Sequence, residues 1–300
     1  MPDADPRDPT GAPAGPGLVL VTGATGHVGG PLLRRLAEAG TPVRAAVRRP
    51  ERVPVPGVER VALDLTDPGT YDAALVGVRA LFLVRPPQVG NPAVLVAFLE
   101  RAVATGVRHV VLLSVQGAER LPFLPHARVE AWLERSGLGW TFLRASFFDQ
   151  NLVDVHGAVI RDRSEVVVPA GRGRTAFVDA EDVAEAAAVA LRRPDEHRGQ
   201  AWTLTGSEAL TYGEVAGILT AVLDRPVRYT QPGLLAYLLT AHRRLRMPPA
   251  LVVTTALIYT TARLGLAAGL TGDLERVLGR PPTTFATFAR REQVVWRSGA

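Results

Sequence analysis

Residues 20–30 read LVTGATGHVGG, and this stretch guides the interpretation of the whole chain. Its three spaced glycines, Gly23, Gly26 and Gly29, follow an apolar run and precede a helical one. Such a loop between a strand and a helix directs backbone N–H groups and the positive helix end at a pyrophosphate. Gly23 would permit the tight turn, Gly26 the close approach of the phosphates, and Gly29 the packing of helix on strand. The stretch predicts a dinucleotide site, with a plain tight turn as the alternative.

Outward from this loop, short apolar runs alternate with helical segments. The predicted strands cover residues 18–22, 42–47, 58–63, 80–84, 109–114 and 139–144. The predicted helices between them cover residues 28–40, 68–77, 91–106 and 126–137. Strands that alternate with crossover helices form a parallel sheet with helices on both faces. The sequence therefore predicts an α/β protein with a Rossmann-type, doubly wound parallel sheet.

After residue 148 the alternation weakens and helical patterns dominate. We expect a Rossmann domain over residues 18–150, to which part of 174–205 returns, and a smaller, mainly helical C-terminal substrate lobe over 151–300. Within that lobe, residues 233–270 are strongly apolar. They are interpreted as a helical lid over a flat, apolar substrate, with ordinary core packing as the alternative.

The composition is that of an ordinary globular protein, with 47% hydrophobic and 21% charged residues. Cysteine is absent, which excludes disulfides, thiolate nucleophiles and Cys-ligated metal centres, and no metal site is expected. Although the net charge is +5, the arginines are scattered singly or in pairs, so no nucleic-acid partner is expected. The segment 250–270 is long enough to resemble a membrane span, but Arg263 and two interior glycines favour a buried helix.

The N-terminal residues 1–17 contain five prolines and almost no apolar side chains. Because they cannot bury enough surface to become ordered, we interpret them as a disordered arm. They also lack the positive-then-apolar pattern of a secretory signal, and the absence of cysteine suits the cytosol. A cytoplasmic monomer or homodimer is expected.

The end of the second predicted strand indicates which dinucleotide binds. An NAD site requires a carboxylate there to hold the ribose hydroxyls. This chain instead has Arg48 and Arg49 after the strand. A guanidinium grips the 2′-phosphate of NADPH through charge-assisted hydrogen bonds, whereas a carboxylate would repel it. NADPH is therefore the expected cofactor, with solvated turn charges as the alternative reading of the two arginines.

Several motifs occur together in a familiar order. VTGATGHVG (21–29) is followed by Asp64-Leu65, SVQGA (114–118), HARVE (126–130) and SGLGWTFLRASFFDQNL (136–152). In this order they resemble the short-chain dehydrogenase/reductase superfamily, and within it the atypical NmrA-like branch that includes triphenylmethane reductase and NADPH quinone reductase. The resemblance extends over about residues 18–290.

The resemblance implies a set of cofactor contacts that follows the strand ends from phosphates to nicotinamide. The implied residues are Gly23, Thr25, Gly26, His27, Val28 and Gly29 at the phosphates, Arg48 and Arg49 at the 2′-phosphate, Asp64 and Leu65 near the adenine, Val84, Arg85 and Pro86 by the ribose, and Ser114, Val115, Ser146, Phe147 and Phe148 at the nicotinamide.

The usual proton donor of that superfamily, a Tyr with a Lys four residues on, is missing. The chain has no lysine, and its five tyrosines lie outside residues 110–150. His126 and Glu130 stand at the dyad's spacing, so His126 is a candidate donor oriented by the carboxylate. The alternatives are that the pair braces a helix and that water or the substrate's own hydroxyl supplies the proton. Ser114 is a candidate for hydrogen bonding the substrate oxygen.

The expected function is that of an NADPH-dependent reductase, or ketoreductase, acting on a bulky aromatic ketone or quinone. A quinone, or a ketone whose carbonyl is hydrogen-bonded to a neighbouring phenol, stabilises its own negative charge and needs little acid help. The chain also resembles tailoring ketoreductases of aromatic polyketides of the simocyclinone (angucyclinone) type, which implies a role in antibiotic biosynthesis. The alternative is an NmrA-like regulator that senses redox state by binding the dinucleotide without turnover.

Overall fold

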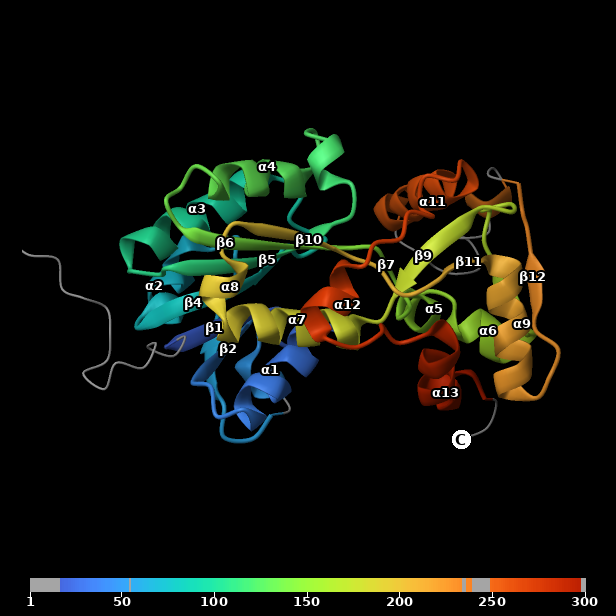
Figure 1. The fold of residues 1–300 in the computed structure, drawn as a ribbon, viewed down its shortest axis with the longest axis horizontal. Coiled ribbons are helices and arrows are strands. Elements are labelled where there is room, and N and C mark those ends of the chain that lie inside the picture. The colour runs from blue at the N-terminus through green and yellow to red at the C-terminus, as the bar shows by residue number, and fades with distance from the viewer. Residues whose placement is uncertain (1–16, 54, 234–235, 239–248, 298–300) are drawn as a thin grey trace, which may run out of the picture. The chain divides into compact units, whose positions relative to one another are not determined.

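The chain forms two compact units (Figure 1). The computed structural model describes residues 17–233, 236–238 and 249–297, apart from residue 54. The first unit contains the residues up to Arg144 together with Val183–Thr203; the second contains Ala145–Asp182 and the residues from Leu204 onward. The first segment of the first unit ends at Arg144, whereas the sequence predicted a boundary at residue 150. Nearly all of the expected disordered arm, and part of the expected lid, lie outside the described residues.

A seven-stranded sheet forms the centre of the first unit. Its strands are β1 (Leu18–Thr22), β2 (Val43–Val47), β3 (Glu59–Ala62), β4 (Val78–Val84), β5 (His109–Val115), β6 (Gly139–Ala145) and β10 (Gln200–Leu204). Their order is β10-β6-β5-β4-β1-β2-β3, and β1 pairs in parallel with both β2 and β4. The chain thus winds outward from β1 in both directions, which confirms the predicted Rossmann-type fold. The strand β10 was not predicted from the sequence.

Helices cover both faces of this sheet (Figure 1). One face carries α1 (Gly29–Glu38) and most of α7 (Ala180–Arg192), and the other carries α2 (Tyr71–Leu75), α3 (Pro92–Ala104) and α4 (Pro125–Leu133). Local signals fix their starts: Asn91 accepts a hydrogen bond from the N–H of Ala93 at 3.0 Å, and a proline begins α3. Short helical turns complete the unit: η1 (Pro50–Arg52), η2 (Pro68–Thr70), η3 (Ala118–Arg120) and α8 (Pro194–His197). Apolar side chains of the sheet, α2, α3 and α4 form one continuous buried core.

The second unit combines small sheets with helices. Its strands are β7 (Phe147–Phe148), β8 (Glu165–Val167), β9 (Arg174–Val178), β11 (Ala209–Thr211) and β12 (Arg228–Thr230), in the orders β11-β9-β7 and β12-β8. Its helices include α5 (Asn151–Asp154), α6 (Gly157–Arg163), α9 (Tyr212–Leu223), α11 (Pro249–Arg263), α12 (Asp273–Leu278) and α13 (Phe285–Trp296). The expectation of a mainly helical lobe overlooked these strands, because segments this short show no clear alternation of apolar and polar residues.

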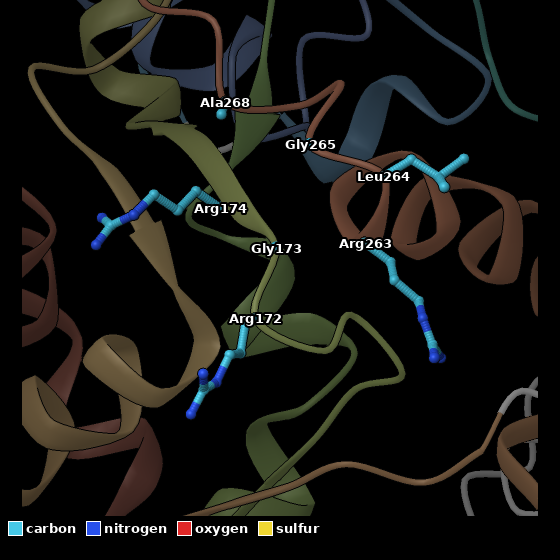
Figure 2. A pocket seen from close by; sticks show the side chains of 7 residues that line it. All are labelled: Arg172, Gly173, Arg174, Arg263, Leu264, Gly265 and Ala268. Carbon is cyan, nitrogen blue, oxygen red and sulfur yellow. The ribbon is translucent and has the colours of Figure 1, made fainter.

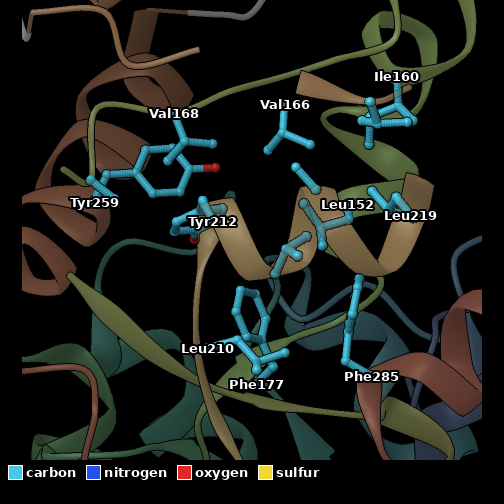
Figure 3. Close-up of a cluster of buried hydrophobic side chains, with 14 of the residues drawn as sticks. Leu152, Ile160, Val166, Val168, Phe177, Leu210, Tyr212, Leu219, Tyr259 and Phe285 are labelled. Carbon is cyan, nitrogen blue, oxygen red and sulfur yellow. The ribbon is translucent and has the colours of Figure 1, made fainter. Parts of the chain in front are cut away.

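Aromatic side chains are prominent in the core of the second unit (Figure 3). The Tyr212 ring meets Phe177 and Tyr259 edge to face, with centroids 5.6 and 5.9 Å apart. Tyr259 lies on α11, within the predicted lid segment, and Ala256 and Ala262 of the same helix are also buried in this core. This face of α11 is therefore part of the core, as the alternative interpretation proposed. A lid role stays a prediction for the rest of residues 233–270. Among the described residues, no helix combines the length and the apolar character that crossing a membrane requires.

A buried histidine in this core makes stability depend on pH. His156 is fully buried, with Nε2 2.7 Å from the Tyr259 hydroxyl. Burial lowers the pKa of His156 from 6.5 to about 4. The folded protein therefore keeps this ring uncharged, whereas the unfolded chain takes up a proton near its ordinary pKa. The contribution of His156 to stability is complete above the unfolded pKa and is lost as the pH falls towards 4.

We expect His156→Gln to reduce the acid sensitivity of folding while keeping a hydrogen-bonding group beside Tyr259. Below pH ~6.5 the parent protein should lose about 1.4 kcal/mol of unfolding free energy per pH unit more than the variant. Urea unfolding of both proteins at several pH values between about 7 and about 5 measures this difference. Parallel pH dependences would show that His156 is not the group responsible.

Candidate functional site

The loop between β1 and α1 depends on glycine at Gly23 for its backbone conformation and at Gly29 for space. Gly23 has a φ of +62°, in the left-handed region that glycine adopts without strain. A Cβ on Gly29 would lie 2.2 Å from the Gly23 carbonyl oxygen, and one on Gly26 would lie 3.3 Å from the same atom. The turn and the close packing of helix on strand, which the sequence predicted, therefore both depend on glycine.

The N-terminus of α1 directly follows this loop and has no capping side chain. Val28, in the N-cap position, makes no side-chain cap, and the first turn contains no acidic residue. Thr25, Gly26 and His27 are exposed, whereas Val28 and Gly29 are buried. A helix of ten residues with an uncapped, glycine-lined N-terminus fits a phosphate group, because the N–H groups and the helix dipole both favour an anion there.

The ends of β2 and β3 bring Arg48 and Asp64 close to each other. Arg48 and Arg49 are exposed beyond the end of β2. Asp64 accepts hydrogen bonds from the N–H and hydroxyl of Thr66, at 2.9 and 2.7 Å. These bonds lower the pKa of Asp64, and the positive charge of Arg48 lowers it further. The next predicted residue, Leu65, is buried, and its carbonyl accepts a hydrogen bond from Tyr71 at 2.6 Å.

On the other side of β1, the end of β4 is hydrogen-bonded to the end of β1 and packs against the glycine loop. Thr22 accepts the N–H of Val84 at 2.9 Å and donates its hydroxyl to the Phe82 carbonyl at 3.0 Å. The Val84 side chain lies against Gly23, where a Cβ would come within 3.6 Å of it. Arg85 and Pro86 follow the strand and are half-buried.

Arg85 contacts His126 across the ends of neighbouring elements. Its Nε donates to His126 Nε2 at 3.3 Å, and its Nη1 donates to the carbonyl oxygens of Val89 at 2.7 Å and Pro86 at 3.3 Å. Burial and the Arg85 charge lower the pKa of His126 from 6.5 to about 4. At neutral pH His126 is therefore an uncharged hydrogen-bond acceptor. Its Nε2 accepts from Arg85 and so carries no proton, and the expected role of His126 as proton donor stays a prediction.

Glu130 does not orient His126, and this part of the sequence interpretation was wrong. The carboxylate accepts the Ser114 hydroxyl at 2.5 Å and Arg144 Nη2 at 2.7 Å. Ser114 and Glu130 are only 2% and 4% exposed, so their hydrogen bond is buried. His126 and Glu130 share α4, but each meets a different strand end because β4 and β5 are neighbours in the sheet. Ser114 directs its proton to Glu130, so toward a substrate it can act only as an acceptor.

The remaining predicted residues are divided between the two units. Val115 ends β5 in the first unit and is half-buried. Ser146, Phe147 and Phe148 belong to the second unit, in β7 and directly before it. The Ser146 hydroxyl is buried and has no hydrogen-bond partner among the described residues. Such a group is available to a ligand, and its role at the nicotinamide stays a prediction.

A pocket of about 460 Å³ in the second unit coincides with none of the predicted residues. Arg172, Arg174 and Arg263 line it, and Figure 2 shows their guanidinium groups pointing away from one another. Arg174 is also paired with Glu214 at 2.8 Å. The pocket therefore has no converging set of donors. Within the described ranges, no three His, Cys, Asp or Glu side chains gather in a way that would hold a metal ion.

The strand order and the β1–α1 loop together define the class of protein, a Rossmann-type dinucleotide-binding protein. The sequence profile of the NmrA-like family matches residues 16–240, and the chain belongs to that family. The family resemblance read from the motifs is thereby confirmed.

Two curated relatives and one solved structure illustrate this membership. The NAD(P)H azoreductase of Xenophilus azovorans is 35% identical over 283 residues, which cover 91% of this chain and 97% of the relative. A (4-alkanoyl-5-oxo-2,5-dihydrofuran-3-yl)methyl phosphate reductase of Streptomyces griseus is 36% identical over 285 residues, covering 91% and 96%. The NADPH-dependent quinone oxidoreductase of Escherichia coli, solved with NADPH, has a TM-score of 0.81 and 25% identity, covering 91% and 99%.

Proposed function

We propose that this chain is an NADPH-dependent reductase that transfers hydride to a bulky aromatic ketone or quinone. The observation that carries the proposal is the β1–α1 loop, where only glycine fits at Gly29 and the helix end is left uncapped for an anion. The similar proteins support the reaction class, since they are named as reductases of an azo compound, a furanone phosphate and a quinone. The chain is accordingly an NAD(P)H-dependent oxidoreductase.

Different residues of the first unit bind different parts of the cofactor. The loop from Gly23 to Gly29 binds the pyrophosphate, and Arg48 binds the 2′-phosphate. Val84 and Ser114, at the ends of β4 and β5, contact the nicotinamide half of the cofactor. The bound cofactor supplies the hydride. The chain has to orient the acceptor and exclude water, and it contains no lysine for a Tyr–Lys dyad.

Consumption of NADPH in the presence of aromatic acceptors tests this function. The full-length protein is mixed with NADPH and, separately, with menadione, an azo dye and a polycyclic aromatic ketone, and the loss of NADPH absorbance is followed. We expect turnover with the quinone or the ketone. Preference for a polyketide-derived ketone would support the narrower role in antibiotic biosynthesis. Binding of NADPH without consumption across the whole panel would favour the regulator instead.

Arg48→Ala should weaken NADPH binding and erase the preference over NADH. Loss of a charge-assisted contact to the 2′-phosphate should raise the Kd for NADPH roughly tenfold or more. The Kd for NADH should stay unchanged, because NADH lacks that phosphate, and it therefore serves as the internal control. Fluorescence titration with both coenzymes measures the two constants. An equal loss of affinity for both would mean that Arg48 supports the loop rather than the phosphate.

A further inference from the structure

We propose that Arg85 binds the acceptor group of the substrate and stabilises the negative charge that hydride transfer creates there. The inference rests on the reductase function proposed above. It identifies a fixed positive charge, instead of a proton donor, as the group that compensates for the missing Tyr–Lys dyad.

Arg85 lies at a position in the sheet where ligands commonly bind. The residue directly follows β4, and β4 lies next to β1 at the point where the strand order reverses direction. In open α/β sheets, ligands bind outside the carboxyl ends of the strands at such a switch point. Arg48 and Asp64 lie beyond β2 and β3, on the opposite side of β1. Arg85 therefore belongs to the half of the crevice that faces away from the adenosine end.

The charge of Arg85 also supports this role. Its hydrogen bonds go to two carbonyl oxygens and to a neutral imidazole, all of them uncharged acceptors. Among the described residues, no carboxylate forms an ion pair with it, although the group is half-buried, and burial lowers its pKa. Its second terminal nitrogen, Nη2, has no acceptor in the same part of the chain. A partly desolvated cation without a counter-ion attracts an anion more strongly than one in water.

His126 holds this guanidinium in place. Because Nε2 accepts the Arg85 Nε–H, we assign the His126 proton to Nδ1. An imidazolium would repel Arg85, so the low pKa of His126 preserves the contact at neutral pH. His126 is then a positioning residue.

The reaction balances without a protein acid. The acceptor takes a hydride, with both of its electrons, from NADPH, and its own π electron pair moves onto the carbonyl oxygen. Arg85 faces the resulting anion. After hydride transfer, a solvent water molecule gives this anion one proton and leaves as hydroxide, which completes the reduced product. A quinone suits this arrangement because its reduced anion is a delocalised phenolate. The reduced anion of an aromatic ketone is an alkoxide with its charge on oxygen, which a fixed positive charge stabilises directly.

A phenol dye tests the charge without turnover. Binding of para-nitrophenol to the protein should lower the pKa of the dye by about one unit or more, because an opposite charge favours the phenolate. Spectrophotometric pH titration of the bound dye measures the shift. Arg85→Met should abolish it, Arg85→Lys should retain part of it, and Arg128→Met, which removes an exposed arginine from α4, should leave it unchanged. Thermal denaturation checks that the variants are folded.

Steady-state kinetics with NADPH and menadione provide a second test of the proposed role of Arg85. Arg85→Met should lower kcat by about 10²–10³-fold, the effect of removing one oxyanion donor, with the Kd for NADPH unchanged. His126→Ala should lower kcat less, and His126→Gln should restore it, because the amide oxygen again accepts from Arg85. An unshifted dye pKa in the parent protein, the same shift in Arg85→Met, or unchanged turnover in Arg85→Met would each overturn the inference alone. A parent protein that consumes no NADPH would overturn the proposed function and this inference together.

Discussion

Gly29→Ala is expected to abolish NADPH binding at ordinary concentrations. The new Cβ would meet the Gly23 carbonyl oxygen at 2.2 Å and its carbonyl carbon at 2.7 Å, so backbone must move. Moving this turn displaces the N–H groups that we propose bind the phosphates. Losing two hydrogen bonds to a charged group costs about 3 kcal/mol or more, which corresponds to roughly a hundredfold in Kd. Calorimetric titration with NADPH measures the change.

Neighbouring glycines provide matched controls for that variant. Gly30→Ala places a Cβ 3.5 Å from the Ala24 carbonyl oxygen, an ordinary contact, so it should bind NADPH normally. Gly26→Ala, with a contact of 3.3 Å, should fold well but bind poorly, because its Cβ occupies space next to the phosphates. Normal affinity in both Gly26→Ala and Gly29→Ala would move the nucleotide site away from this loop and remove the main support for the proposed function.

The sequence predicted the first unit well because its signals are local. The glycine spacing, the Asn91 cap and the strand–helix alternation each extend over a few residues and survive in the structure. The strand β10 was missed because it joins the sheet from the returning segment, next to β6, far away along the chain. The small strands of the second unit pair over long separations too, for instance β8 with β12.

The contacts of the candidate site also depend on residues that lie far apart in the sequence. The spacing of His126 and Glu130 suggested a mutual contact, as neighbours on a helix often make. Their partners are instead set by the adjacency of β4, β5 and β6, which brings Arg85, Ser114 and Arg144 to α4. No periodicity in the sequence encodes which strand ends meet. The one indication in the sequence was Arg85, which directly follows a central predicted strand. The family resemblance implied only that it lies near the ribose.

Arg144→Met should destabilise the folded protein by about 3–5 kcal/mol, because it leaves a buried carboxylate without its cation. Arg144 reaches Glu130 with Nη2 at 2.7 Å and with Nε at 3.2 Å, while the carboxylate is only 4% exposed. The Ser114 hydroxyl would remain as its only partner among the described contacts. Urea unfolding at neutral pH measures the loss as a lower midpoint with an unchanged slope.

Two further variants separate a buried charge from lost packing. Arg120→Met removes an arginine whose side chain is 85% exposed and which pairs with Glu119 at 3.4 Å, so stability should change by no more than about 0.5 kcal/mol. The double variant Arg144→Met with Glu130→Leu removes both charges, and it should be more stable than Arg144→Met alone. Equal stability of the double and single variants would mean that the Arg144 side chain acts through its packing over Phe142, where its guanidinium lies 5.9 Å from the ring centroid. In that case the Glu130 carboxylate would act only as the acceptor for Ser114, and the position of the Ser114 proton would not depend on Arg144.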